Sequence, residues 1–277
     1  MVRGRCKKGS LPASFVAMMT TMYDRVSRVP ARTGRFITPS AFLKGKLIEG
    51  GIKPEKITVI PNFVDVQSFR AGAGLSDEKA DSPGAAAGAS SPHHTAGAAD
   101  GYYLYFGRLS REKGIDLLID AVSGLGRGKL KIAGEGPLEG ELKGHAAAAG
   151  ADVEFLGFRT GAELRALLEK AMFVVVPSRW YENLPFSVME SLAAGRPVIA
   201  ADIGGIPEMV EDGVNGMLFP PGDAGALRCR VARMLDDDAM RRRMSKAGRE
   251  KAERLYGPGT HYEKIMEVYG ELLGRRV

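Results

Sequence analysis

Short apolar runs alternate with helix-like apolar stripes from residue 101 onward. The run at 102–106 predicts a strand, and apolar residues then recur at positions 115, 118, 119 and 122, which is the spacing of one helix face. Further strands are predicted at 130–133, 153–156, 173–176, 197–200 and 217–219, and further helices near 164–168, 185–194, 207–210 and from about 224. Strands that alternate with helices predict a parallel, doubly wound α/β sheet.

The chain before this region carries a weaker pattern. Strand-like runs at 35–38 and 56–60 flank a helix-like segment that contains Phe42, Leu43 and Leu47. Two consecutive glycines follow that segment and end the predicted helix.

Residues 71–100 are rich in Ala, Gly, Ser and Pro. Such a composition buries too little apolar surface to offset the entropy lost on ordering, so we expect a flexible loop or linker. His93 and His94 lie inside this segment, where a solvated pair is a simpler interpretation than a metal site.

Composition changes this picture little. The 277 residues are 44% hydrophobic and 26% charged, as in ordinary globular proteins. The formal net charge of +6 suits phosphates, anionic lipid or nucleic acid. The basic residues are spread along the chain without a basic and aromatic tract, so nucleic acid is not an expected partner.

The two cysteines, Cys6 and Cys229, lie far apart and form no CxxC motif. Neither a disulfide framework nor a zinc site is therefore expected, and the count fits a reducing cytoplasm. No run approaches the roughly 18–20 apolar residues that span a bilayer.

The basic N-terminus followed by the apolar stretch 11–19 resembles a signal peptide, but Pro12 and Ser14 interrupt it. We expect an ordinary helix there. The net charge and the arginine run 241–243 leave peripheral attachment at the inner membrane face open, although a solvated helix face is the preferred interpretation of that run.

Ligands of parallel sheets bind beyond the carboxyl ends of the strands, and four such ends carry unusual residues. After the strand at 102–106 come Gly107, Arg108 and Lys113, a glycine turn with two cations before a helix. Backbone N–H groups at a helix start and nearby cations favour an anion such as phosphate.

Gly134 and Gly136 follow the strand at 130–133 and predict a tight turn near a ligand. The dinucleotide-binding fingerprint needs a third small residue where this chain has Glu139, so NAD is not expected.

Two carboxylates bracket the third strand end, because Glu182 precedes a predicted helix and Glu190 lies within it. Paired carboxylates are the machinery of glycosidases, but one carboxylate also suits the hydroxyl groups of a ribose. The fourth end carries Gly204 and Gly205, whose N–H groups are suited to an anion. Together the four ends predict a site for a phosphate ester that bears hydroxyl groups.

These motifs resemble those of the family 4 retaining glycosyltransferases, which have the GT-B fold. The central likeness is Glu182 and Glu190 with seven residues between them, followed by Ser-Leu-Ala-Ala-Gly-Arg-Pro-Val-Ile-Ala. The Gly107-Arg108 turn, the Gly134 turn and the Gly204-Gly205-Ile-Pro-Glu segment also match. The resemblance covers most of 101–277 and extends back through about 35–69.

The resemblance implies a nucleoside-diphosphate sugar as the donor, linked to UDP, GDP or ADP, with no cofactor and no metal ion. Arg108 and Lys113 would hold the distal phosphate and stabilise it as a leaving group, and Glu182 would face the donor sugar near the reacting carbon. Glu190 would bind the ribose. The residues implied in donor binding are Gly107, Gly134, Gly136, Asn183, Leu184, Pro185, Phe186, Glu190, Gly204 and Gly205.

The resemblance also implies a domain plan. Residues 1–60 would be the C-terminal remnant of an acceptor domain, 61–100 an entry segment with the low-complexity loop, and 101–255 a Rossmann-like donor domain. Residues 256–277 would form a helix that packs back on the N-terminal part. Family members carry a complete N-terminal domain ahead of the region where this chain begins. A truncated or split reading frame, or a partner chain that supplies the missing domain, is our hypothesis.

The expected reaction moves a sugar, with retention of configuration, to a glycan, lipid or small-molecule acceptor that the sequence does not name. One alternative is a module that binds nucleotide sugar without turnover by itself. A second is a sugar-nucleotide epimerase, whose base and acid have no recognisable pattern here. A glycosidase is supported by the two carboxylates alone.

Overall fold

The computed structural model describes residues 33–69 and 101–274, and it divides into two units. The first consists of the described residues up to Ile60 and those from Met266 onward, and the second runs from Pro61 to Ile265. The N-terminal helix predicted from the sequence, the loop at 71–100 with its two histidines, and Cys6 lie outside the described residues.

The smaller unit contains strands β1 (Phe36–Thr38) and β2 (Ile57–Val59), which pair in parallel, with helix α3 (Ala41–Glu49) between them. The Ser40 hydroxyl accepts a hydrogen bond from the N–H of Leu43 at 3.2 Å, which caps the start of α3. Both strands and the helix predicted in this part of the sequence are therefore confirmed.

The larger unit contains a six-stranded sheet in the order β5-β4-β3-β6-β7-β8, in which every neighbouring pair is parallel. The strands are β3 (Tyr102–Phe106), β4 (Lys129–Ala133), β5 (Val153–Gly157), β6 (Val174–Val176), β7 (Val198–Ala201) and β8 (Gly216–Phe219). The chain builds one half of the sheet outward from β3 and then returns to lay β6 on the other side of β3. This reversal of strand order places a crevice between β3 and β6.

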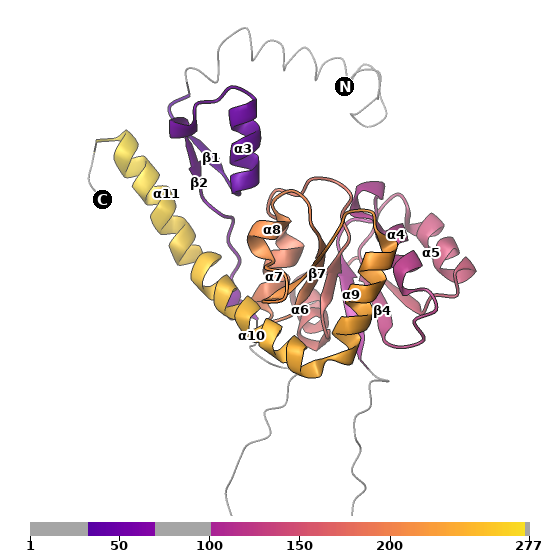
Figure 1. The fold of residues 1–277 in the computed structure, drawn as a ribbon. Coiled ribbons are helices and arrows are strands. Elements are labelled where there is room, and N and C mark those ends of the chain that lie inside the picture. The colour runs from indigo at the N-terminus through magenta and orange to yellow at the C-terminus, as the bar shows by residue number, and fades with distance from the viewer. Residues whose placement is uncertain (1–32, 70–100, 275–277) are drawn as a thin grey trace, which may run out of the picture. The chain divides into compact units, whose positions relative to one another are not determined.

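Helices cover both faces of this sheet (Figure 1), because the strands carry apolar side chains toward both faces and these must be buried. The helices that contribute to the cores on these faces are α4 (Ile115–Val122), α5 (Glu139–Ala148), α6 (Gly161–Lys170), α7 (Phe186–Ala193), α8 (Ile206–Met209), α9 (Ala224–Asp236) and α10 (Asp238–Leu255), and α11 (Pro258–Leu272) follows α10. Tyr103 and Tyr105 belong to the core formed with α4, α5 and α9, whereas Leu104 and Phe106 belong to the core formed with α6, α7 and α8.

Helix α11 runs from the larger unit into the smaller one, since the division falls at Ile265. Within the larger unit, the His261 ring contacts the carbonyl oxygen of Pro61 at 2.7 Å and packs against Phe63. Within the smaller unit, Arg35 forms an ion pair with Glu271 at 2.7 Å.

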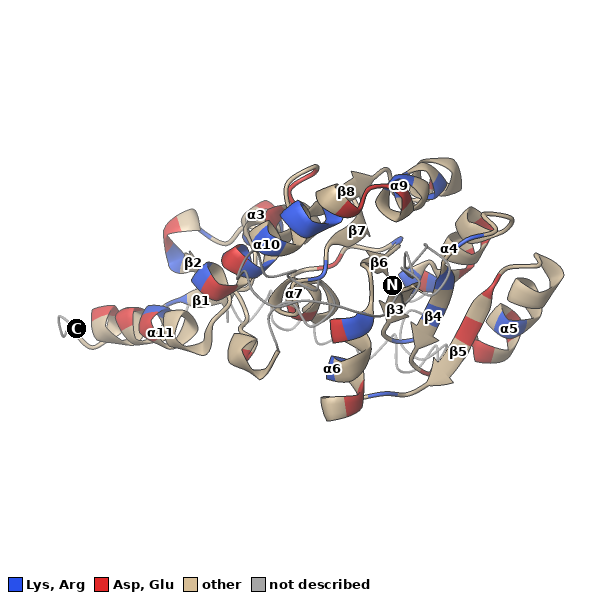
Figure 2. Ribbon diagram, turned by 90° about the horizontal axis from the view of Figure 1, so that it is seen from below, with Lys and Arg blue, Asp and Glu red and all other residues tan. Residues whose placement is uncertain are grey.

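The arginine run 241–243 only partly fits a solvated helix face. Figure 2 shows acidic and basic residues interspersed along α10. The Arg241 side chain is 12% exposed, and it donates to the carbonyl groups of Met234 and Leu235 and pairs with Asp238. Arg241 therefore fastens the end of α9 to the start of α10, and the expectation is wrong for this residue. In the described ranges, no helix is both long and apolar enough to cross a membrane.

The turn after β4 touches the turn after β3. A side chain at Gly134 would place its Cβ 1.9 Å from the carbonyl oxygen of Gly107, and one at Gly136 would lie 2.2 Å from that of Leu109. The Gly107 N–H also donates to the carbonyl of Ala133 at 3.0 Å. The glycines are required here for the close contact of two backbones.

We expect Gly134→Ala to lower the free energy of unfolding by more than about 2 kcal/mol, because the new methyl group overlaps the backbone carbonyl oxygen of Gly107, so that the main chain itself must shift. Urea denaturation checks this. Gly144→Ala in α5 is the control, since nothing lies near its Cβ and alanine favours the helix by about 0.5–1 kcal/mol. Equal stability of the Gly134 variant and the wild type would contradict the prediction.

Candidate functional site

A cavity of about 550 Å³ lies at the carboxyl ends of β3 and β6, where the strand order reverses. Most residues that the sequence singled out line it. These are Gly107, Arg108, Lys113, Glu182, Asn183, Leu184, Pro185, Phe186 and Glu190. Gly134, Gly136, Gly204 and Gly205 are not among its lining residues.

Lys113 ends a single 3-10 turn, Arg111–Lys113, between β3 and α4. The next residue, Gly114, has φ of 67° and lies against the β6 loop, where a Cβ would be 2.2 Å from the carbonyl oxygen of Pro177. The Arg179 N–H donates to the carbonyl of Glu112 at 2.9 Å. The loops after β3 and β6 are therefore joined backbone to backbone, and this contact directs Lys113 into the cavity.

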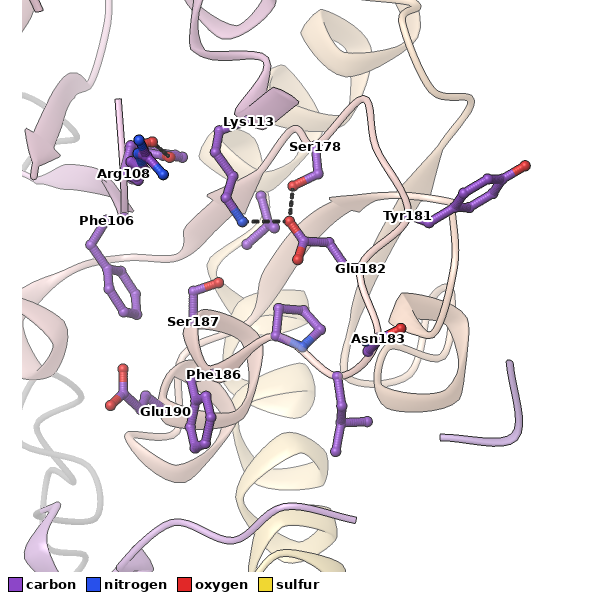
Figure 3. Close-up of a pocket in the computed structure, with 15 residues that line it drawn as sticks. Phe106, Arg108, Lys113, Ser178, Tyr181, Glu182, Asn183, Phe186, Ser187 and Glu190 are labelled. Atoms are coloured by element: carbon purple, nitrogen blue, oxygen red, sulfur yellow. Dashed lines mark hydrogen bonds and ion pairs between the residues drawn. The ribbon is translucent and has the colours of Figure 1, made fainter. Parts of the chain in front are cut away.

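The carboxylate of Glu182 is held by two donors on one oxygen. Lys113 Nζ lies 2.6 Å from Oε1, and the Ser178 hydroxyl donates to the same atom at 2.8 Å (Figure 3). The Glu182 side chain is 17% exposed, so both bonds act in surroundings where charge-assisted hydrogen bonds are strong.

The main chain of Glu182 rests on the turn after β7. The Gly205 N–H donates to the carbonyl oxygen of Glu182 at 2.7 Å, and a Cβ at Gly204 would lie 2.4 Å from that oxygen. The paired glycines thus fix the backbone of Glu182. The Gly205 N–H that the sequence suggested for an anion is engaged by this backbone bond.

Glu190 lies in the second turn of α7, which begins directly after Pro185. Burial raises the pKa of Glu190, and no charge or hydrogen bond among the described residues offsets that effect. A half-buried carboxylate of this kind is a strong acceptor for hydroxyl groups of a ligand. Figure 3 shows it in another part of the cavity from Lys113, with Phe106 and Phe186 around it.

Arg108 is exposed and directly follows the glycine turn, and its carbonyl oxygen accepts a hydrogen bond from the Tyr105 hydroxyl at 2.9 Å. The acid of this loop, Glu112, is held by the Ser110 hydroxyl at 2.6 Å, and that bond is the main reason why the pKa of Glu112 is lowered. The cavity therefore has two cations, Arg108 and Lys113, on one wall and Glu190 on another.

Sequence reasoning missed part of the lining, namely Tyr105, Phe106, Val176, Ser178 and Ser187. Tyr105, Phe106 and Val176 belong to apolar strands, and serines are common in loops and helices, so neither type stood out. Tyr181, an aromatic residue beside the single Trp180, lines the cavity as well. Ser178 comes two residues after the end of β6, which was the available signal. In the described part of the chain, no group of three or more His, Cys, Asp or Glu side chains is placed to hold a metal ion.

Comparison with known proteins matches the chain to one family. The family described as "Glycosyl transferases group 1" matches residues 91–251, which include every lining residue of the cavity. The alpha-D-kanosaminyltransferase of Streptomyces kanamyceticus is 30% identical over 175 residues, which cover 61% of this chain and 45% of that protein. The glycogen synthase of Mycobacterium tuberculosis is 36% identical over 156 residues, 53% of this chain and 37% of that protein.

The chain spans about half the length of the curated relatives that it matches. Among solved structures, the sucrose-phosphate synthase of Thermosynechococcus elongatus is similar with a TM-score of 0.72 and 26% identity, over 91% of this chain and 62% of that one. HepE of Anabaena in complex with UDP-glucose is similar with a TM-score of 0.71 and 24% identity, over 86% and 64%. These likenesses confirm the predicted fold class, a Rossmann-like parallel-sheet domain of the GT-B type.

Burial of Glu190 predicts a pH-dependent cost. The pKa of Glu190 in the folded state lies above the unfolded value of 4.5. The free energy of unfolding is therefore highest below pH 4.5 and falls as the pH rises through the folded pKa. We expect Glu190→Gln to be more stable than the wild type at pH 7, by less than about 1 kcal/mol since the carboxyl group is only partly buried. The difference should disappear below about pH 4.5.

Urea denaturation of both chains between pH 4 and 7.5 measures this difference. Glu250→Gln, at an exposed position in the interior of α10, is the control and should change stability little at any pH. A Glu190→Gln chain that is less stable than the wild type at pH 7 would show that favourable contacts outweigh the burial of the charge.

Proposed function

The chain belongs to the family of glycosyl transferases group 1, and from this premise we propose that it binds a nucleoside-diphosphate sugar and serves in the transfer of the sugar to an acceptor. The observation that carries the proposal is the cavity between β3 and β6, which combines two cations with a half-buried carboxylate. The two cations fit a diphosphate and the carboxylate fits a ribose, and a nucleoside diphosphate contains both.

Arg108 and Lys113 are the proposed phosphate ligands. As the bond between the sugar and the diphosphate breaks, negative charge grows on the leaving phosphate, and cations already in place lower the barrier. The loop contact at Gly114 supports this role, because it holds Lys113 in the cavity before any ligand arrives.

Glu190 is the proposed ribose ligand. Two neighbouring hydroxyl groups of a ribose would donate to its carboxylate and would offset the burial that raises its pKa. Glu182 is proposed to face the donor sugar near the reacting carbon, with transfer that retains configuration and needs no metal ion. Gly107, Asn183, Leu184, Pro185 and Phe186 complete the proposed donor contacts.

Gly134, Gly136, Gly204 and Gly205 have a supporting part in this proposal. Their backbones contact the turn at Gly107 and the backbone of Glu182, so they set the shape of the site. Donor contacts from them are a further proposal, for which the family resemblance is the support.

The acceptor and the rest of the enzyme are proposals of the same kind. We propose a glycan, a lipid or a small molecule as the acceptor, bound with the help of a further domain such as the N-terminal one that the family resemblance implies. A partner chain is one source of such a domain. The domain limits near residues 60, 100 and 255 and attachment to the inner membrane face stay predictions from the sequence.

The runner-up function is a module that binds nucleotide sugar and turns over nothing by itself. The length of the relatives supports this alternative, since this chain spans about half of each. An epimerase or a glycosidase has no comparable support. UDP is the first nucleotide to test, because structures similar to this one hold UDP or UDP-glucose.

We expect calorimetric titration with UDP, GDP, ADP, UDP-glucose and GDP-mannose to give saturable binding for one base. Glu190→Ala should weaken that binding about tenfold or more, because the ribose loses hydrogen bonds to a charged group. Glu141→Ala is the matched control and should bind as the wild type does. Equal affinity of the Glu190 variant and the wild type would contradict the proposed ribose contact.

The phosphate contact has its own test. We expect Arg108→Ala to weaken a nucleoside diphosphate about tenfold but to leave the monophosphate of the same base nearly unchanged, because the cation acts on the distal phosphate. Arg127→Ala is the control, since Arg127 is exposed, does not line this cavity and pairs with Asp236. An equal loss of affinity for both nucleotides would contradict the proposed contact between Arg108 and the distal phosphate.

A further inference from the structure

We propose that Ser178 is a positioning residue that holds the Glu182 carboxylate when Lys113 turns from Glu182 to the phosphate of the donor. The inference rests on the proposed function, because it takes Lys113 as a phosphate ligand. It adds a residue and an exchange of partners to that function.

The starting point is that one oxygen of Glu182 serves two donors. Lys113 Nζ and the Ser178 hydroxyl lie 2.6 and 2.8 Å from Oε1. Two donors on one acceptor oxygen weaken each other's bonds, because their positively charged hydrogens lie close together and repel. Removal of either one therefore strengthens the bond of the other.

The two donors differ in how far they can move. Ser178 is 1% exposed and follows β6 in a loop whose backbone is fixed, through Pro177, against Gly114. Lys113 has a flexible four-carbon side chain that is 29% exposed and borders the cavity. Lys113 is the partner that can leave, and Ser178 is the partner that stays.

Ligand binding creates a competition for Lys113. A diphosphate beside Lys113 and the Glu182 carboxylate are both anions, and the ammonium group cannot serve both at full strength. The backbone of Glu182 stays in place through its bond to Gly205. Its carboxylate then depends on the Ser178 hydroxyl, whose bond becomes stronger in the ligand-bound state than in the free chain because the repulsion from the Lys113 ammonium is gone.

This difference between the two states gives Ser178 an effect on affinity. Loss of its hydroxyl costs the ligand-bound state more than the free state, so Ser178→Ala should bind a nucleoside diphosphate more weakly. Glu182→Gln should have the opposite effect, because a neutral amide competes less for Lys113. In a chain that already carries Glu182→Gln, Ser178→Ala should change little further.

The experiment is a double-mutant cycle of Ser178→Ala and Glu182→Gln, with affinity for UDP measured by calorimetry, or for GDP or ADP if the wild type prefers that base. We expect Ser178→Ala to bind roughly three- to tenfold more weakly and Glu182→Gln roughly three- to tenfold more tightly than the wild type. The double variant should match Glu182→Gln within about twofold.

Two controls separate positioning from folding. Ser245→Ala removes another buried hydroxyl, which bonds the carbonyl of Gly195 away from the cavity, and should leave affinity unchanged. Ser178→Cys keeps the size of the side chain but replaces the hydroxyl with a weak donor, and should resemble Ser178→Ala. It also serves if the alanine chain does not fold, and thermal unfolding is recorded for every chain.

An unchanged affinity of folded Ser178→Ala, or an equal loss with and without Glu182→Gln, would overturn the proposal while the donor site stands. A wild-type chain that is folded and binds none of the nucleotides would instead remove the proposed function, and this inference with it.

Discussion

The site depends on one constraint, the side-by-side pairing of parallel strands β3 and β6 whose following segments diverge. Parallel pairing brings two strand ends to one edge of the sheet, and the reversal of strand order keeps a crevice open between the loops that leave them. These loops are then joined by backbone contacts between Gly114 and Pro177 and between Arg179 and Glu112. Cations from one loop and a carboxylate from the other meet only because of this pairing.

The fold was readable from the sequence where apolar spacing was strong. Strand β3 and helix α4 lie as predicted, since β3 is a short continuous apolar run and the apolar positions of α4 follow the period of 3.6. Helix α5 has no counterpart among the helices predicted from apolar spacing, because Leu142 and Ala146 are its only buried residues and give no stripe. The arginine at 241 was misjudged because a cation that bonds two carbonyl groups looks, in sequence, like a solvated one.

The site was readable where the residue type was unusual for its place. Cations and carboxylates at strand ends have few structural reasons to be there, and the cavity contains Arg108, Lys113, Glu182 and Glu190. Ser178 was not predicted as a site residue, because the role of a hydroxyl group depends on the atom that it bonds, and the sequence does not show that atom. The paired glycines were found, but the sequence could not tell whether their N–H groups faced an anion or another backbone, and Gly205 faces the backbone of Glu182.

The contact between the turns at Gly107 and Gly134 also limits how this site can diversify. Where two backbones touch, as they do here and at Gly204, any side chain displaces the framework. Phe186 and Tyr181 border the same cavity, yet more than half of each side chain is open to solvent. Substitutions that change the donor sugar, in evolution or in a mutant library, are therefore expected at exposed positions such as Phe186 and Tyr181. They are not expected at the glycines where two backbones touch.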